Sequence, residues 1–342
     1  MTAGRDGSQW LALRGRYCII AVGVRPAKPG SLGGGRNVTG PVIDWLLSEE
    51  NPSVRYFTLT DLLGRPLHDP QAQAARDAIR SSPVAAAILA AQRPDGAWVS
   101  PKEMYQPKYR STLWQMIILA ELGVPGEDER VGAAMESHIL PYLERATGGL
   151  KARDIHCLMG YSLFFLHRLG YGDHPVARRF AEVTVAAYQA EGWPCKYASR
   201  PDCSWGMVKV LRALAALPAG GRPPGTDRVV ARAAEGLLEH RFWFEEPAPD
   251  RPYVTNRDWL RFGFPLFYQS DLLEMLLAVK AAGYGGHPRF SRLLREVQGR
   301  RGADGTWVLG RGFNRHMHVT VEPAGRPSRW ITLRALQVMA GS

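Results

Sequence analysis

The feature that most constrains the fold of this chain is an alternation between two kinds of helical segment. One kind is apolar almost throughout, as expected for helices that are buried on all sides. The other kind has apolar residues at i, i+3, i+4 and i+7, with charged residues on the opposite face. The apolar segments are 113–122, 158–169, 205–217 and 272–279, and the amphipathic segments are 176–188, 229–238 and 290–297. This order predicts inner helices that are shielded from water by outer helices.

The junctions between the two kinds of segment also repeat. A glycine follows the apolar segment and a proline precedes or begins the next helix, at 122–125, 169–175 and 283–288. Glycine suits the left-handed residue that ends a helix, and proline suits the first helical turn. Repeated around a ring, the unit predicts an all-α fold, a single (α/α)5-6 toroid of inner and outer helices over residues 41–342. Residues 1–40 have no helical period, and we interpret them as a flexible leader.

The charge and the cysteine content limit the functional classes to which this chain can belong. The chain has 43 Lys and Arg against 32 Asp and Glu, a formal net charge of +11 that favours anionic partners. The basic residues are scattered, which predicts no nucleic-acid groove but leaves peripheral contact with a membrane open. Four cysteines are too few for a disulfide scaffold, and no apolar stretch reaches the roughly 20 residues of a membrane span. We therefore expect a cytoplasmic protein.

Short tryptophan motifs follow the amphipathic segments. Residues 92–98 read Gln-Arg-Pro-Asp-Gly-Ala-Trp, residues 298–307 repeat this with a longer spacer, and residues 191–193 are a degenerate third copy. Asp-Gly favours a tight turn, and tryptophan can cover a helix end. These motifs resemble the QW motif of the terpenoid cyclase and protein prenyltransferase superfamily. The chain is most similar to short, single-toroid bacterial members with the prenyltransferase and squalene-oxidase type repeat.

The resemblance implies a toroid in which the Gln and Trp residues join neighbouring helix pairs. It also implies an apolar, isoprenoid-like ligand, with an anionic headgroup, in a central aromatic cavity. The acidic DxDD and DDxxD motifs of the cyclases are absent from the sequence, so the reaction does not follow from the fold. We favour a terpenoid cyclase-like enzyme. The alternatives are a zinc-dependent enzyme that activates thiols, and a non-catalytic binding or scaffold toroid.

Polar and aromatic residues gather at the starts of the apolar segments. If these helices run parallel, their N-terminal ends share one mouth, where the helix dipoles favour anions. A buried carboxyl of raised pKa would be the proton donor, arginines would bind a headgroup, and aromatic rings would hold an apolar chain. The predicted catalytic residues are Asp271, Asp202 and His156. The predicted substrate-binding residues are Arg110, Trp114, Tyr161, Trp205, Arg257, Trp259, Tyr268, Arg329 and Trp330.

Purely structural roles for the same residues stay open as alternatives. The aspartates are also suited to be helix N-caps, and the aromatic residues to be core packing. Lys209 lies inside an apolar segment, so it needs a buried partner, and Asp202 is the acidic residue that we expect to supply it.

Three of the four cysteines fall in the same region. Cys157 and Cys203 are about one repeat apart, and Cys195 lies in the segment that leads to Cys203. Three thiolates and one imidazole would suit tetrahedral Zn²⁺. The candidates for the imidazole are His156, His316 and His318, of which we name His316. Buried cysteines also pack as small hydrophobic residues, and one of them could be a catalytic thiol instead.

Overall fold

The computed structural model describes residues 40–148, 156–195, 203–239 and 259–341. Every regular element in these ranges is helical, apart from two isolated β-bridges, which confirms the all-α prediction. The α-helices are α2 (Pro41–Leu46), α3 (Pro52–Phe57), α4 (Pro70–Ile79), α5 (Pro83–Ala90), α6 (Thr112–Leu122), α7 (Glu129–Ala134), α8 (Leu140–Thr147), α9 (His156–Arg168), α10 (Pro175–Glu191), α11 (Ser204–Ala215), α12 (Thr226–Glu239), α14 (Leu272–Ala281), α15 (Pro288–Gln298) and α16 (Arg329–Met339). Shorter turns are η2 (Thr58–Leu62), η3 (Met135–Ile139), η4 (Ala219–Gly221) and η5 (Asn314–His316). Residues 1–39 of the predicted leader lie outside the described ranges.

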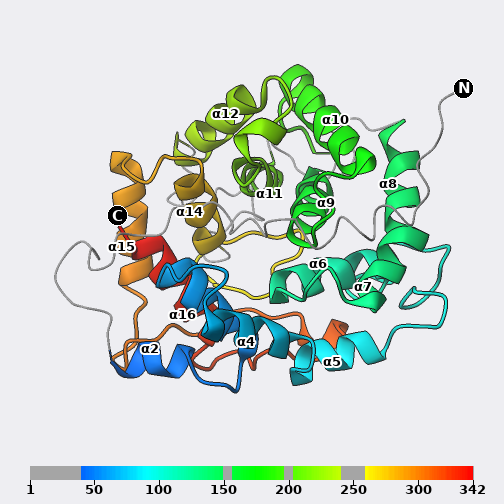
Figure 1. The fold of residues 1–342 in the computed structure, drawn as a ribbon. Coiled ribbons are helices and arrows are strands. Elements are labelled where there is room, and N and C mark those ends of the chain that lie inside the picture. Colours follow the sequence, from blue (N-terminus) through cyan, green and yellow to red (C-terminus); the bar gives the residue numbers. More distant parts are fainter. Residues whose placement is uncertain (1–39, 149–155, 196–202, 240–258, 342) are drawn as a thin grey trace, which may run out of the picture.

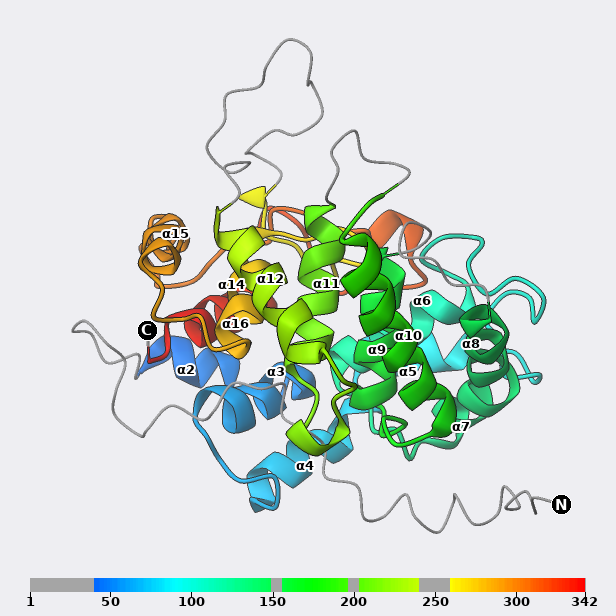
Figure 2. The ribbon, with the colours of Figure 1, turned by 90° about the horizontal axis from the view of Figure 1, so that it is seen from above.

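The apolar and the amphipathic helices occupy different positions. Helices α9, α11 and α14 lie toward the centre, and α8, α10, α12 and α15 lie around them (Figure 1). All residues of α6 are buried, whereas α15 buries one face only. From above, α9, α10, α11 and α12 lie side by side (Figure 2), in agreement with the contacts among them.

Helices α6 and α16, which are buried almost throughout, are also inner helices, and the inner helices follow one another as neighbours. Contacts run from α6 to α9, α11, α14 and α16 in that order, and α16 also contacts α3 and η2. The ring of Phe57, at the end of α3, packs against Gly123, where a Cβ would lie 2.6 Å from Cζ of that ring. Helix α3 therefore touches both the last inner helix and the end of α6.

Glycines end three of the inner helices as the sequence predicted. Gly123, Gly170 and Gly283 have φ of +76°, +81° and +91°, a region that favours glycine. Pro175 and Pro288 then begin the outer helices α10 and α15. The same backbone device thus sets the path from an inner helix to an outer one at separate points of the chain.

The two complete tryptophan motifs make the same hydrogen bonds. The indole Nε1–H of Trp98 donates to the carbonyl of Ile88 (2.7 Å), and that of Trp307 donates to the carbonyl of Val297 (2.8 Å). The backbone N–H of each tryptophan donates to a threonine hydroxyl on the next inner helix, Thr112 on α6 and Thr332 on α16. Each motif therefore joins an outer helix to the inner helix that follows it.

Gln92 extends the first motif to a second outer helix. Its Nε2 donates to the carbonyl of Gly96 (2.9 Å) and to that of Arg130 on α7 (2.8 Å).

Within the described ranges, no helix combines the length and apolar character needed to cross a membrane.

Candidate functional site

Aromatic rings from three parts of the chain meet near the N-terminal ends of α6, α11 and α14. The ring centroid of Tyr109 lies 5.3 Å from Trp114, 4.8 Å from Phe267 and 6.4 Å from Tyr268. Trp205, in the first turn of α11, lies 6.3 Å from Tyr268. We call these five residues the aromatic cluster. The sequence predicted Trp114, Trp205 and Tyr268 as binding residues, and the structure brings them together with Tyr109 and Phe267.

Backbone conformation singles out two members of this cluster. Tyr109 (φ +68°) and Phe267 (φ +51°) are the non-glycine residues with positive φ in the described chain. A left-handed backbone costs an L-residue on the order of 1–2 kcal/mol, and such residues occur disproportionately at functional sites. The Tyr109 backbone is held by Gln115, whose Nε2 donates to its carbonyl (2.8 Å), and its hydroxyl lies 3.2 Å from that of Tyr268.

Three residues that follow members of the aromatic cluster in the sequence have a buried side-chain oxygen without a hydrogen-bond partner among the described residues. Oε1 of Gln115, Oε1 of Gln269 and Oγ of Ser270 are buried and have no hydrogen-bond partner among the described residues. Gln115 follows Trp114, and the other two follow Tyr268. A buried polar atom without a hydrogen bond lowers the stability of the fold by about 1–3 kcal/mol. We therefore expect a ligand or an ordered water molecule to bind these atoms.

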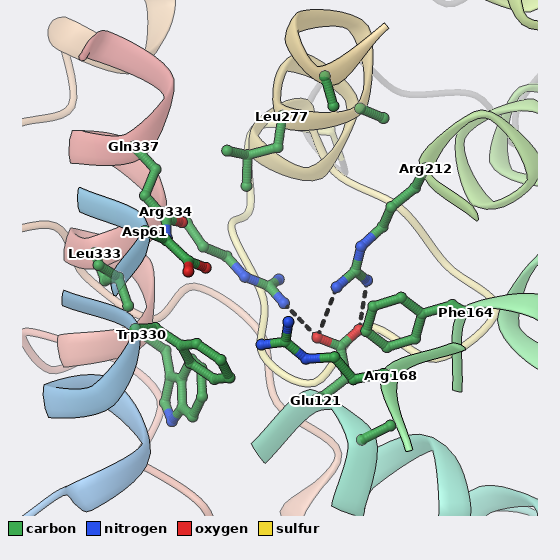
Figure 3. Close-up of a pocket in the computed structure, with 14 residues that line it drawn as sticks. Asp61, Glu121, Phe164, Arg168, Arg212, Leu277, Trp330, Leu333, Arg334 and Gln337 are labelled. Carbon is green, nitrogen blue, oxygen red and sulfur yellow. Dashed lines mark hydrogen bonds and ion pairs between the residues drawn. The ribbon is translucent and has the colours of Figure 1, made fainter. Parts of the chain in front are cut away.

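A second polar region lies toward the C-terminal ends of the inner helices. A pocket of about 70 Å³ is lined by side chains from α3, η2, α6, α9, α11, α14 and α16 (Figure 3). We call it the charged pocket, because its lining includes Asp61, Glu121, Arg168, Arg212 and Arg334. None of these five residues was among those predicted from the sequence, because the predicted site lies at the opposite helix ends.

Glu121 is the centre of an ion-pair network in this pocket. Its carboxylate accepts hydrogen bonds from both terminal nitrogens of Arg212 and from Arg334 (2.9 Å), and Arg212 also donates to Glu274 (3.1 Å). Burial by itself raises the pKa of Glu121, but the charges of Arg212 and Arg334 outweigh it and lower the pKa to about 2. Glu121 is therefore ionised at neutral pH.

Lys209 is joined to the same network and has partners other than the one predicted. Its ammonium group forms an ion pair with Glu274 on α14 and donates to the hydroxyl of Tyr161 on α9 (3.0 Å). The predicted partner, Asp202, lies outside the described residues. Burial lowers the pKa of Lys209 to about 8. Tyr161, predicted to bind substrate, thus contacts a buried lysine and is not part of the aromatic cluster.

Asp271, a predicted catalytic residue, is an N-cap. One carboxylate oxygen accepts from the N–H of Glu274 (2.9 Å), and the other accepts from the N–H of Gly263 (2.8 Å). Burial raises its pKa, while these two hydrogen bonds act in the opposite direction. Both oxygens therefore have structural partners, and a role as proton donor stays a prediction.

The two predicted headgroup arginines that the structure describes have different partners. Nε of Arg110 donates to the carbonyl of His316 (3.2 Å), next to the aromatic cluster. Arg329 instead pairs with Glu50 and lies over the ring of Trp45, 4.9 Å from its centroid. The third, Arg257, lies outside the described residues.

The remaining predicted residues have other surroundings. Trp330 stacks on Phe264, with centroids 3.9 Å apart, and lines the charged pocket. Trp259 is buried. Asp202 lies outside the described ranges, and so does the side chain of His156.

The sequence predicted that Cys157, Cys195 and Cys203 lie close together as zinc ligands. Burial raises the pKa of Cys157 to about 11 and that of Cys203 to about 12, and the thiol of Cys195 adds to both increases. Sγ of Cys203 also accepts a hydrogen bond from Gly206 (3.4 Å) at the start of α11. His316, the proposed fourth ligand, lies beside Tyr109 with ring centroids 5.9 Å apart. In the described part of the chain, no three His, Cys, Asp or Glu residues form a group that could hold a metal ion, so the zinc site stays a prediction.

Comparison with known proteins does not assign the chain to a group. No protein-family model, curated protein or solved structure matches it. The geometry of the aromatic cluster and of the charged pocket is therefore the basis for a functional proposal.

Proposed function

We propose that the chain is a single α/α toroid of the terpenoid cyclase and protein prenyltransferase type that binds an apolar, isoprenoid-like ligand. Two observations support the fold. The inner helices contact one another in chain order and line one pocket, and the motifs at Trp98 and Trp307 make matching hydrogen bonds. Matching contacts at two repeats are what a ring of similar helix pairs requires.

The aromatic cluster is the observation that carries the ligand assignment. Trp205 and Tyr268 are partly exposed, whereas Tyr109, Trp114 and Phe267 are buried. Rigid aromatic faces supply a large apolar contact area at small entropic cost, which suits a flexible hydrocarbon chain. We expect the unpartnered oxygens of Gln115, Gln269 and Ser270 to accept a hydrogen bond from a hydroxyl or other donor on the ligand.

A reaction is a further part of the proposal, with Asp61 as the acid. Burial raises the pKa of this carboxyl, although the nearby charge of Arg168 and the hydroxyl of Thr60 act against the increase. Unlike Asp271, Asp61 lines a pocket, together with the aromatic residues Phe164 and Trp330. A carboxyl of raised pKa at such a place is suited to donate a proton.

Binding of farnesol to the purified full-length chain tests the ligand assignment, with quenching of tryptophan fluorescence as the readout. We expect Trp205→Leu and Tyr268→Leu each to weaken binding roughly tenfold, because an aromatic contact is worth on the order of 1 kcal/mol or more. Trp45→Leu, on α2, is the matched control and should bind like the unchanged chain. Equal affinities in all four proteins would rule out the cluster as the binding site. Binding without any turnover by a panel of prenyl substrates would favour the non-catalytic toroid.

A zinc site on the three thiols is the second proposal. What supports it is that the thiol of Cys195 adds to the raised pKa of both Cys157 and Cys203, since this effect requires the thiols to be near one another. Elemental analysis of the protein purified without chelators should give close to one zinc per chain, and Cys203→Ser should lower this ratio. A ratio near zero in the unchanged chain would end the proposal.

A further inference from the structure

Three guanidinium groups from different helices meet in the charged pocket. Arg168 ends α9, Arg212 belongs to α11 and Arg334 belongs to α16; Arg212 and Arg334 point toward the carboxylate of Glu121, and Arg168 lines the same pocket (Figure 3). Glu121 accepts hydrogen bonds from Arg212 and Arg334. Arg168 forms no hydrogen bond or ion pair with any residue that the structure describes; its guanidinium lies over the ring of Phe57, 4.5 Å from the centroid.

The network has more positive than negative charge. Each guanidinium carries five N–H donors, of which Arg334 uses one on Glu121 and Arg168 uses none among the described residues. The cations of the network are Arg168, Lys209, Arg212 and Arg334, and the carboxyls are Asp61, Glu121 and Glu274. Donors and positive charge are therefore left without a partner at the pocket.

We propose that the charged pocket binds a small oxyanion, a phosphate or carboxylate group, through Arg168 and Arg334 beside Glu121. The planar fork of arginine matches the oxygens of both groups and can bind them with two hydrogen bonds. A volume of about 70 Å³ holds a group of only a few heavy atoms. The side chains of Phe57, Phe164 and Trp330 exclude water from part of the lining, which strengthens charge interactions there.

This site is separate from the aromatic cluster. The cluster lies at the N-terminal ends of the inner helices, whereas Glu121, Arg168 and Arg212 lie in the last turns of theirs. The oxyanion is either a free ion or the end group of an organic molecule. The proposal does not require that an isoprenoid-like ligand binds at the other end.

A structural role for Arg168 is the competing explanation. Cations stabilise the C-terminal ends of helices, and Arg168 is the last residue of α9. If neutralising this helix end were its only role, the protein would bind no oxyanion at the pocket, and replacing Arg168 would change stability alone.

Titration calorimetry of the full-length chain with inorganic phosphate, at low ionic strength, tests the proposal. We expect saturable binding that Arg168→Gln weakens at least roughly tenfold, since the lost hydrogen bonds are charge-assisted. Arg179→Gln is the matched control, because Arg179 is exposed on α10 and pairs only with Glu182 among the described residues. Its affinity should be unchanged. Arg168 holds no hydrogen-bonded partner there, so its replacement should leave the melting temperature nearly unchanged.

Two further ligands identify the source of the oxyanion. Tighter binding of octyl phosphate than of inorganic phosphate indicates an organic ligand, and equal affinity of the two indicates a free ion. Titration with acetate tests whether the pocket accepts a carboxylate. No saturable binding of any of these three, or equal phosphate affinity in the unchanged chain and Arg168→Gln, would overturn the proposal. If Arg168→Gln does not fold, Arg168→Lys replaces it, and unchanged affinity there is the contrary result. Trp205→Leu should keep phosphate binding, so this proposal and the isoprenoid assignment fail independently.

Discussion

Tyr109 and Phe267 pack with their ring centroids 4.8 Å apart, and both have a left-handed backbone. They belong to loops that precede two different inner helices, α6 and α14. Each ring is buried, at 8% and 0% exposure. Contact between the two rings therefore helps to hold two unfavourable backbone conformations in place.

Replacing Phe267 by glycine and by alanine separates the ring from the backbone. Both variants lose the buried ring, which costs about 3–5 kcal/mol. Glycine normally destabilises relative to alanine, but at φ +51° it avoids the left-handed penalty, so Phe267→Gly should be more stable than Phe267→Ala by about 1 kcal/mol. Urea denaturation of the two variants measures the difference. An alanine variant that is the more stable of the two would argue against strain at this position.

Gly160→Ala should destabilise the protein, although alanine is the better helix former. Gly160 lies in α9, where a Cβ would be 2.4 Å from the carbonyl carbon of Lys209 on α11. The propensity gain of about 1 kcal/mol is smaller than the cost of separating two packed backbones. Thermal unfolding should show a lower melting temperature. The control is Gly220→Ala on the surface, where a Cβ meets nothing within 4 Å and little change is expected.

Glu121→Gln should have opposite effects on stability and on anion binding. It leaves Arg212 and Arg334 without their shared carboxylate, and breaking a buried ion pair costs about 3–5 kcal/mol. It also removes the internal anion that competes for Arg334, so phosphate should bind more tightly to the folded variant. Glu127→Gln, which breaks only the exposed pair with Arg76, should cost about 1 kcal/mol or less. Calorimetric affinity and urea denaturation test both parts, and an unchanged phosphate affinity would count against the second.

His167 should make stability depend on pH in the weakly acidic range. Burial lowers its pKa to about 4, compared with about 6.5 for an exposed histidine. Between these values the unfolded chain binds more protons than the folded one, so stability should fall as the pH drops from about 6.5 to 4. The loss is at most about 3 kcal/mol.

Denaturation midpoints measured across this range test the effect. His167→Gln should flatten the profile, because it removes the group that protonates on unfolding. His318→Gln, an exposed site, should keep the original slope. Parallel profiles for all three proteins would show that another group controls the acid response.

Local patterns were sufficient to predict α6, α9, α10, α11, α12, α14 and α15 and the alternation of apolar and amphipathic helices among them. Apolar periodicity identified 113–122 as buried on all sides, and glycine followed by proline identified the turn before Pro288, because both signals depend on residues close in sequence. The grouping of Trp114, Trp205 and Tyr268 was also predicted, because each lies at the start of an apolar segment. The sequence also contained a signal for the charged pocket that the predictions did not use, since Glu121 and Arg212 are charged residues inside the apolar segments 113–122 and 205–217.

The tertiary structure alone decided which of these charges meet. Glu121 and Arg334 are 213 positions apart, and Lys209 pairs with Glu274 rather than with an acid near it in sequence. The reason is physical. A helix period specifies which side of a helix is buried, but not which residue of another helix faces it, nor at what height. Segment composition therefore determined a helical protein with apolar inner helices, while the packing of those helices against one another created the aromatic cluster at one end and the arginine-lined pocket toward the other.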